Sequence, residues 1–240
     1  MPRVAIGSIV PSSNRVVERT TAAILRHLPG IDSCIARIPY APDGSGQPEG
    51  AYDAAAYAGA ARLLGHAGVA AVGWNGTRGA ALGLVQDRAL VALMEGAAGC
   101  PATTTALHAV DLLRRLGARR IAFVLPSAAE DAAAHGAGFA AEGIATAGAR
   151  GLGCTDNLSA AAVPPGAIMA AARAAAVEAA PDAVLLWSTN LDGLGCMAPL
   201  EAELGIPVLD SAALGVAALL AAAGIGTAAL SPLGRLFATA

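Results

Sequence analysis

The 240-residue chain contains no lysine, so all 15 of its basic residues are arginines. A Schiff-base lysine, pyridoxal phosphate chemistry and a P-loop are therefore excluded, because each needs a lysine side chain. The net charge of −3 also lacks the basic surplus expected of a nucleic-acid-binding protein. Charged residues make up only 14% of the chain, which excludes a disordered protein.

Long apolar runs and metal-binding cysteine patterns are missing as well. Although 55% of the residues are hydrophobic, no run approaches ~18 residues without a glycine, a proline or a charge, so we expect no membrane-spanning helix. The four cysteines, Cys34, Cys100, Cys154 and Cys196, form neither a CxxC pair nor a Cys/His cluster with zinc spacing. We therefore predict no metal site and expect reduced thiols in a cytoplasmic protein.

Short apolar runs alternate along the chain with longer stretches of helical spacing. The short runs are Val4–Val10, Val69–Gly73, Arg120–Leu125, Ala183–Trp187 and Pro207–Leu209. The helical stretches are Val16–Leu28, Ala51–Ala67, Ala80–Ala97, Thr105–Leu116, Gly166–Ala179 and Ala212–Ala222. This alternation predicts an α/β fold in which helices flank parallel sheets. The Pro- and Gly-rich segment Pro39–Gly50 is predicted to be a loop that closes over a site.

Three segments recur in the same order along the chain. The pairs are Ile9–Ser12 with Val124–Ser127, Val69–Trp74 with Asp182–Trp187, and Cys100–Ala106 with Ile206–Ala212. The repeat predicts two similar halves, each a short parallel sheet flanked by helices, related by a pseudo-twofold axis with the site between them. We place the division at 1–117 and 118–240, and leave open whether the C-terminal helix crosses over.

Small polar residues follow the predicted strands, where ligands bind in open parallel sheets. Those after strands of the first half are Pro11, Ser12, Asn14, Asn75, Gly76 and Thr77, and those of the second are Ser127, Ser188, Thr189 and Asn190. Their hydroxyl, amide and backbone N–H groups suit an anion such as a carboxylate. Ser, Thr and Asn are also the preferred helix caps, so a purely structural role stays open at each position.

Eight segments also carry a resemblance to a known family. They are Ile6–Asn14, Gln47–Ala54, Gly68–Thr77, Cys100–Thr104, Leu116–Pro126, Pro181–Leu191, Leu204–Ala213 and Leu233–Phe237. Their order and spacing resemble the aspartate/glutamate racemase superfamily, and most nearly its maleate isomerase and arylmalonate decarboxylase branch. The resemblance implies a cofactor-independent enzyme with two α/β halves and a small carboxylic acid bound between them.

The chain departs from that family at its catalytic cysteines, one of which stands in each half of the racemases. The resemblance places Gly76 at the first position, or Asn75 if the register shifts by one, and Ser188 at the second. None of these residues is a thiol. The decarboxylases are similar at the first position, where a glycine precedes a threonine as in Gly76–Thr77, but they keep the second cysteine.

The resemblance implies roles for other positions too. Asn14 matches a residue that holds a substrate carboxylate, Asn157 a second polar contact, and Ser127 replaces a tyrosine. Thr77, Thr189 and the backbone of Ser188 would donate hydrogen bonds to an oxyanion. The histidines, His27, His66, His108 and His135, are interpreted as surface or capping residues.

These observations favour a decarboxylase-like lyase or an isomerase that acts on a small carboxylic acid, with Ser188 and Thr77 as catalytic residues and no cofactor. Decarboxylation fits best because it forms an enediolate without an initial base, so only the later protonation needs an acid. Two alternatives stay open: a non-catalytic or vestigial carboxylate-binding protein, and a serine-dependent hydrolase. Nucleic acid and membrane are not expected as partners, and a homo-oligomer is left open.

Overall fold

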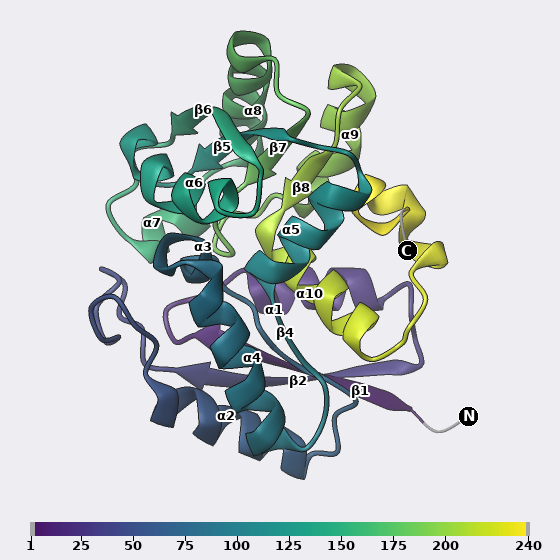
Figure 1. Ribbon diagram of the computed structural model, residues 1–240. Helices are drawn as coiled ribbons and strands as arrows, with labels where there is room; N and C mark the ends of the chain where they lie inside the picture. Colours follow the sequence, from purple (N-terminus) through teal and green to yellow (C-terminus); the bar gives the residue numbers. More distant parts are fainter. Residues whose placement is uncertain (1–2, 239–240) are drawn as a thin grey trace.

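Two four-stranded parallel sheets form the framework of the computed structural model, which describes residues 3–238 (Figure 1). The first sheet has the order β2-β1-β3-β4 and contains β1 (Val4–Pro11), β2 (Ile31–Ile38), β3 (Val72–Trp74) and β4 (Ala102–Thr104). The second has the equivalent order β6-β5-β7-β8 and contains β5 (Arg120–Leu125), β6 (Ala145–Gly151), β7 (Ala183–Leu186) and β8 (Val208–Asp210). The predicted fold of two similar α/β halves is therefore confirmed.

Helices connect the strands in both halves. Those of the first half are α1 (Val17–Leu25), α2 (Ala54–His66), α3 (Arg78–Leu82), α4 (Leu84–Ala98) and α5 (Thr105–Arg115). Those of the second are α6 (Ala132–Ala140), α7 (Asn157–Ala161), α8 (Pro165–Ala179), α9 (Leu194–Leu204) and α10 (Ser211–Ala222), with 3-10 turns η1 (Ala129–Asp131), η2 (Ala228–Leu233) and η3 (Arg235–Phe237). The single helix predicted over 80–97 is two helices, because Gly83 at φ 93° interrupts it. No helix within residues 3–238 is long and apolar enough to cross a membrane.

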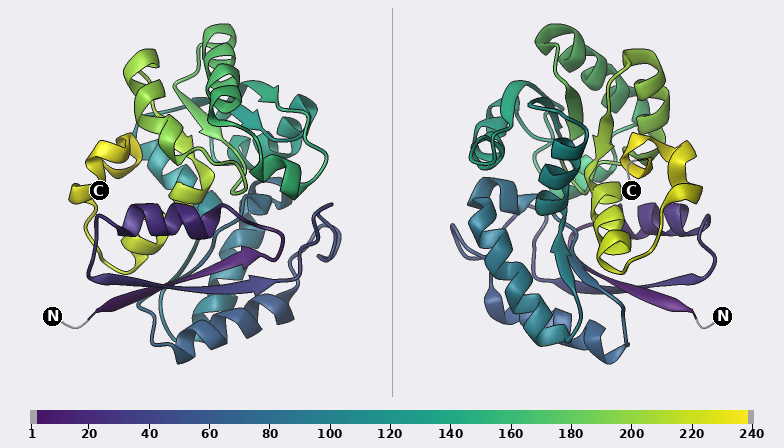
Figure 2. Two further views of the ribbon diagram at one scale, coloured as in Figure 1. Left: turned by 180° about the vertical axis from the view of Figure 1, so that it is seen from behind. Right: turned by 45° about the vertical axis from the view of Figure 1, so that its right-hand side comes forward.

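The last helix, α10, packs against the first sheet although it follows the last strand of the second. Figure 2 shows α1 and α10 on the face of the first sheet that is turned toward the second half, with α2 on the opposite face. A continuous core joins the halves there, and includes Ile6, Phe123 and Leu219. Because α10 is apolar around its whole circumference, it is stable only when it is enclosed on all sides. The division at residue 117 stays a prediction.

The fourth strand of each sheet ends in a residue that caps the following helix. The Thr104 hydroxyl accepts a hydrogen bond from Leu107 N at 3.2 Å at the start of α5. The Asp210 carboxylate accepts one from Ala213 N at 2.8 Å at the start of α10. These equivalent caps turn the chain sharply at the carboxyl ends of both sheets, which is the region where the site was predicted.

Candidate functional site

A cavity of about 390 Å³ lies between the carboxyl ends of the two sheets. Its wall contains every residue predicted from the sequence except Ser12 and Asn75. The predicted residues that line it are Pro11, Asn14, Gly76, Thr77, Ser127, Asn157, Ser188, Thr189 and Asn190. The structure thus brings together segments that lie far apart in the sequence.

Ser12 and Asn75 point elsewhere. The exposed Ser12 hydroxyl donates to Tyr40 O and accepts from Tyr40 N, both at 2.9 Å, and so pins the start of the 39–50 loop. Asn75 is buried, and its Nδ2 donates to Ala212 O at 3.1 Å. A Cβ on Gly215 of α10 would overlap the Asn75 carboxamide. Asn75 therefore fixes α10 against β3 and does not contact the cavity.

The 39–50 loop covers one side of the cavity, as its composition predicted, through Tyr40, Pro42, Asp43 and Gly44. It also reaches the second half, because Pro42 O accepts a hydrogen bond from Asn157 N at 2.8 Å. The loop is thus held at its tip by the opposite half.

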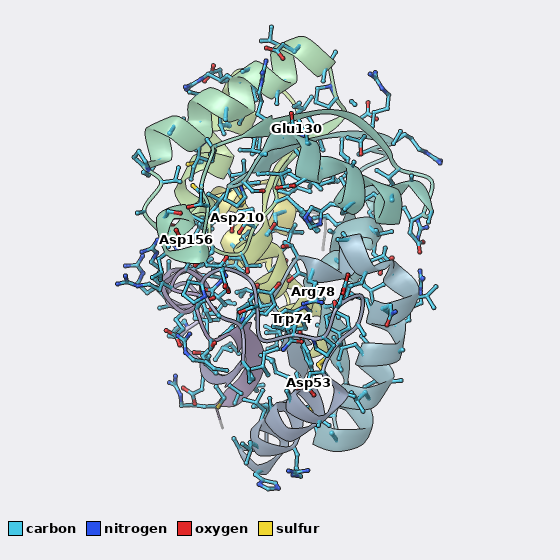
Figure 3. The ribbon with its side chains drawn as sticks, turned by 90° about the vertical axis from the view of Figure 1, so that its left-hand side faces the viewer. Asp53, Trp74, Arg78, Glu130, Asp156 and Asp210 are labelled. Atoms are coloured by element: carbon cyan, nitrogen blue, oxygen red, sulfur yellow. The ribbon has the colours of Figure 1, made fainter. Side chains whose placement is uncertain are left out.

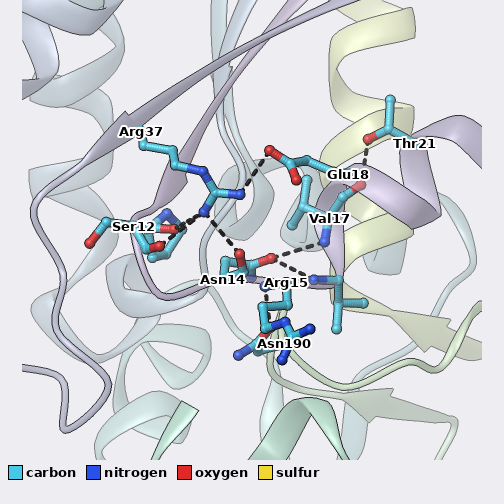
Figure 4. A network of polar contacts seen from close by, with 10 residues as sticks. Ser12, Asn14, Arg15, Val17, Glu18, Thr21, Arg37 and Asn190 are labelled. Atoms are coloured by element: carbon cyan, nitrogen blue, oxygen red, sulfur yellow. Dashed lines mark hydrogen bonds and ion pairs between the residues drawn. The ribbon is translucent and has the colours of Figure 1, made fainter. Parts of the chain in front are cut away.

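Side-chain amides in the wall connect the two halves (Figure 4). Asn14 Oδ1 accepts from the N–H groups of Val16 and Val17 at 2.9 Å, and its Nδ2 donates to Thr189 O at 3.0 Å and Thr189 Oγ1 at 3.2 Å. Asn190 Oδ1 accepts from Arg15 N at 2.9 Å. The amides predicted as ligands for a substrate therefore already carry structural hydrogen bonds across the interface.

Asn157 forms a further link between the halves. Its Nδ2 donates to Ser13 Oγ at 2.8 Å, and its carbonyl accepts from Asn190 Nδ2. On the first-half side, Arg37 of β2 donates to Asn14 O at 2.9 Å and pairs with Glu18 at 2.8 Å. This arrangement makes the rim of the cavity rigid.

Gly76 lies under the indole of Trp74 in the first half. Trp74 is 1% exposed and packs edge-to-face on Tyr57, with ring centroids 5.0 Å apart. A Cβ at position 76 would lie 2.9 Å from Trp74 Nε1 and closer still to two ring carbons. The indole thus fills the space that a side chain at this position would need. Figure 3 shows Trp74 and Arg78 near each other where the halves meet.

Several donors in the wall are free to meet a ligand. Ser188 Oγ accepts from Asn190 N at 3.1 Å, which leaves its own proton available. Thr77 precedes α3 without capping it through its side chain. Within residues 3–238 the backbone N–H groups of Gly76 and Thr77 donate to no backbone carbonyl. These groups converge on the cavity from both halves.

An imidazole and a thiol are among the side chains in the wall that the sequence reasoning missed. His135, interpreted above as a surface or capping residue, is half-buried on α6 and lines the cavity. Burial lowers the pKa of His135 to about 4, and its Nδ1 is buried without a hydrogen-bond partner. Cys154 follows the unpredicted strand β6, where its N–H donates to Pro126 O at 2.7 Å, and it also lines the cavity.

The fully buried carboxyl groups of Asp87 and Asp210 lie outside the cavity wall. Asp87 accepts hydrogen bonds from the Tyr52 and Thr104 hydroxyls at 2.5 Å, and burial raises its pKa. Burial also raises the pKa of Asp210 to about 7. In the described part of the chain no three His, Cys, Asp or Glu side chains gather as a metal site would require.

Comparison with known proteins identifies the family. The model of a family described as arylmalonate decarboxylase matches residues 49–237. Arylmalonate decarboxylase of Bordetella bronchiseptica is 34% identical in an alignment of 241 positions, which covers 97% of this chain and 95% of that protein. The chain belongs to the arylmalonate decarboxylase family.

Solved structures agree with the assignment to the arylmalonate decarboxylase family. A double mutant of arylmalonate decarboxylase in a liganded form, with one glycine changed to cysteine and one cysteine to serine, is 28% identical with a TM-score of 0.84. The match covers 99% of this chain and 100% of that one. A maleate isomerase of Pseudomonas putida, crystallised with maleate, shares the fold at 24% identity with a TM-score of 0.85, over 99% of this chain and 98% of that one.

This member of the arylmalonate decarboxylase family has a distinctive set of groups in its cavity. Positions 76 and 188 carry glycine and serine, while the thiol in the wall is that of Cys154 on the β6–α7 loop. Arg78 adds a guanidinium, one nitrogen of which donates to Pro48 O at 2.5 Å. The cavity wall therefore combines hydroxyl, amide and guanidinium groups with an imidazole and a thiol that the sequence reasoning did not place there.

Proposed function

We propose that this chain is a cofactor-independent lyase that decarboxylates a small malonate-type acid, with Ser188 and Thr77 as its catalytic hydroxyl residues. The observation that carries the proposal is the cavity between the strand ends, which presents hydroxyl and backbone N–H donors. Gly76 offers no side chain as a base, and its Trp74 cover leaves no room for one. Loss of CO2 suits such a site because it forms an enediolate without prior removal of a proton.

The free hydrogen-bond donors of the cavity wall would stabilise the enediolate. The N–H groups of Gly76 and Thr77 and the hydroxyls of Thr77 and Ser188 would bind its oxygens as negative charge develops there. In other enzymes the loss of one such donor lowers turnover by about 10²–10³-fold. The predicted substrate-binding surface is completed by Pro11, Asn14, Ser127, Asn157, Thr189 and Asn190.

Arg78 is a positively charged group in the cavity wall that would attract a substrate carboxylate. A guanidinium has five N–H donors, and one nitrogen alone is engaged with Pro48, so the others can bind an anion. Asp43 and Asp156 lie in the same wall, but backbone N–H groups of their own loops bind both carboxylates and lower their pKa values. Both carboxylates therefore stay ionised, and their oxygens are hydrogen-bonded within their own segments.

The alternatives have less support. A serine hydrolase needs a general base that accepts the Ser188 proton. Ser188 Oγ instead accepts a hydrogen bond from Asn190 N, and it donates to no side chain within the described residues. An isomerase that attacks through a thiol would have no cysteine at position 188. A non-catalytic carboxylate-binding protein would use the same cavity without turnover.

The test is incubation of the purified protein with phenylmalonate, methylmalonate and maleate. We expect CO2 and the corresponding monoacid from a malonate, and roughly 10²–10³-fold slower release from Thr77→Val, which keeps the shape of the side chain but loses its hydroxyl. Nuclear magnetic resonance of maleate would report isomerisation separately. Calorimetric binding of phenylmalonate without any CO2 release would show a binding protein and refute the proposal.

A further inference from the structure

His135 is an imidazole in the cavity wall to which none of the predicted roles applies. It lies on α6, and its ring meets the Trp187 indole edge-on, with centroids 6.3 Å apart and an interplanar angle of 76°. Trp187 immediately precedes Ser188, and His135 and Ser188 line the same cavity. The ring nitrogen Nδ1 is buried and has no hydrogen-bond partner within the described residues, so Nε2 is the nitrogen that can contact a ligand.

Two glycines of α6 bring His135 to this position. A Cβ on Gly138 would overlap Ala80 O of α3, and one on Gly136 would overlap Thr146 Oγ1 of β6. The helix can therefore press at once against the first half and against its own sheet. This close approach puts a residue of the second half beside the strand ends of the first.

The proposed reaction needs an acid that Ser188 cannot supply. A serine hydroxyl is too weak an acid to protonate an enediolate carbon unaided, whereas histidine is the side chain most often used for proton transfer. We propose that His135 is the catalytic acid that returns a proton to the reacting carbon, an inference that rests on the proposed decarboxylase function. The donor comes from α6 and not from a strand end.

The charge on His135 would follow substrate binding. In the empty cavity burial keeps the imidazole neutral, and Asp131 of η1 only partly opposes this lowering of its pKa. A carboxylate within ~4 Å, at an effective dielectric constant of about 20, raises such a pKa by roughly three units. Entry of a dianionic malonate therefore draws a proton onto the imidazole.

Other charged groups lie on the neighbouring elements whether or not a substrate is bound. Arg78 on α3 donates to Pro48 O, and Asp156 on the loop after β6 caps α7. Arg150 on β6 pairs with Glu178, and Glu130 of η1 is exposed. The charge that changes near His135 on substrate binding is therefore the charge of the substrate itself.

The step balances as follows for a malonate dianion. The bond from the α-carbon to one carboxylate breaks, its electron pair enters the enediolate, and CO2 leaves. The pair then forms a C–H bond with the proton from the imidazolium Nε2, which yields the monocarboxylate and neutral His135. One proton taken from water restores the cycle, so each turnover consumes one proton.

His135→Asn tests the assignment, with His108→Asn as its matched control. His108 on α5 is also half-buried, and burial also lowers its pKa to about 4, but it does not line the cavity. On an arylmalonate with two different α-substituents, we expect kcat to fall about 10²–10⁴-fold in His135→Asn and to stay unchanged in His108→Asn. A positioned acid delivers its proton to one face, so the residual product of His135→Asn should be racemic.

Proton uptake gives a readout that a structural role would not change. Calorimetric titration with phenylsuccinate, a dicarboxylate that is a dianion at pH 7 and whose loss of CO2 would not give an enediolate, in two buffers of different ionisation enthalpy should show uptake of at least about half a proton by the wild type at pH 7, because a pKa raised by roughly three units from about 4 lies near 7. We expect none in His135→Asn, with melting temperature measured in parallel. Retention of uptake, of stereochemistry and of the pH profile by His135→Asn would overturn the assignment, as would their loss in Cys154→Ser alone. If the wild type releases no CO2 from any malonate, the proposed function itself fails.

Discussion

The glycine at position 76 is predicted to be obligatory because of its neighbour and not because of backbone conformation. Gly76→Ala would place a Cβ 2.9 Å from Trp74 Nε1 and closer to two ring carbons. Trp74 is 1% exposed and is held edge-to-face by Tyr57 and Tyr52, so the indole cannot move into solvent. Overpacking of this kind costs about 1–3 kcal/mol.

The expected loss is readily measured. In a domain of this size each kcal/mol shifts the melting temperature by about 2–4 °C, so Gly76→Ala should lower it by about 2–12 °C in calorimetry. The control is Gly59→Ala in the middle of α2, where a Cβ would meet nothing within 4 Å. That substitution should stabilise the protein by roughly 0.5–1 kcal/mol, because alanine is the better helix former.

Trp74→Leu provides the second half of the test. If the indole causes the strain, Gly76→Ala should cost less in the Trp74→Leu background than in the wild type, and the double-mutant cycle should report that coupling. Equal melting temperatures for Gly76→Ala and the wild type would refute the reasoning, since the space above Gly76 would then be empty.

Three further results are expected. Asn14→Ala should lower the free energy of unfolding by about 2–3 kcal/mol in urea, because it removes the acceptor for the N–H groups at the start of α1 and the link to Thr189. Unchanged stability would show that Asn14 does not hold the two halves together. Ser188→Ala should slow the release of CO2 from phenylmalonate by about 10²–10³-fold, since it removes a hydroxyl donor to the enediolate; an unchanged rate would argue against that role at this position. Asp210→Asn tests a pH dependence: the raised pKa of about 7 means that stability from the neutral carboxyl is present below about pH 4 and lost as the pH rises to 7. Between pH 4 and pH 7 the free energy of unfolding of the wild type should therefore fall by on the order of 4 kcal/mol relative to that of Asp210→Asn. The same difference between the urea midpoints of the two proteins at pH 4 and at pH 7 would exclude this effect.

The strands that the sequence predicted are those buried on both faces. β1, β5 and β7 lie inside their sheets and read as apolar runs, which is the pattern the prediction relied on. The missed strands β2 and β6 occupy the same edge of each sheet, where exposure permits polar and small residues such as Asp32 and Gly148. These two edge strands therefore lack the hydrophobic signal, and the repeat alone could have indicated them. At the opposite edges, β8 is buried throughout and was predicted, whereas β4, with two threonines among its three residues, was missed.

The same cause limited the prediction of the site. The residues predicted after the inner strands lie in the cavity wall, with the exception of Ser12 and Asn75, because the carboxyl ends of parallel strands meet at one edge. Cys154 was missed since its strand was missed, and His135 because an Ala- and Gly-rich segment reads as surface until the close packing of α6 is known. The roles of the amides also escaped sequence reasoning, which cannot distinguish a ligand for a substrate from a link between halves.

The return of α10 to the first sheet has a consequence for how the chain acquires its structure. The apolar face of the first sheet turned toward the second half is covered by α1 and by a helix made from residues 211–222, near the end of the chain. During synthesis this face stays partly exposed until residues 211–222 have been made. The halves should accordingly fold in one cooperative transition, and a fragment ending at residue 117 should aggregate, because its largest apolar surface has no cover.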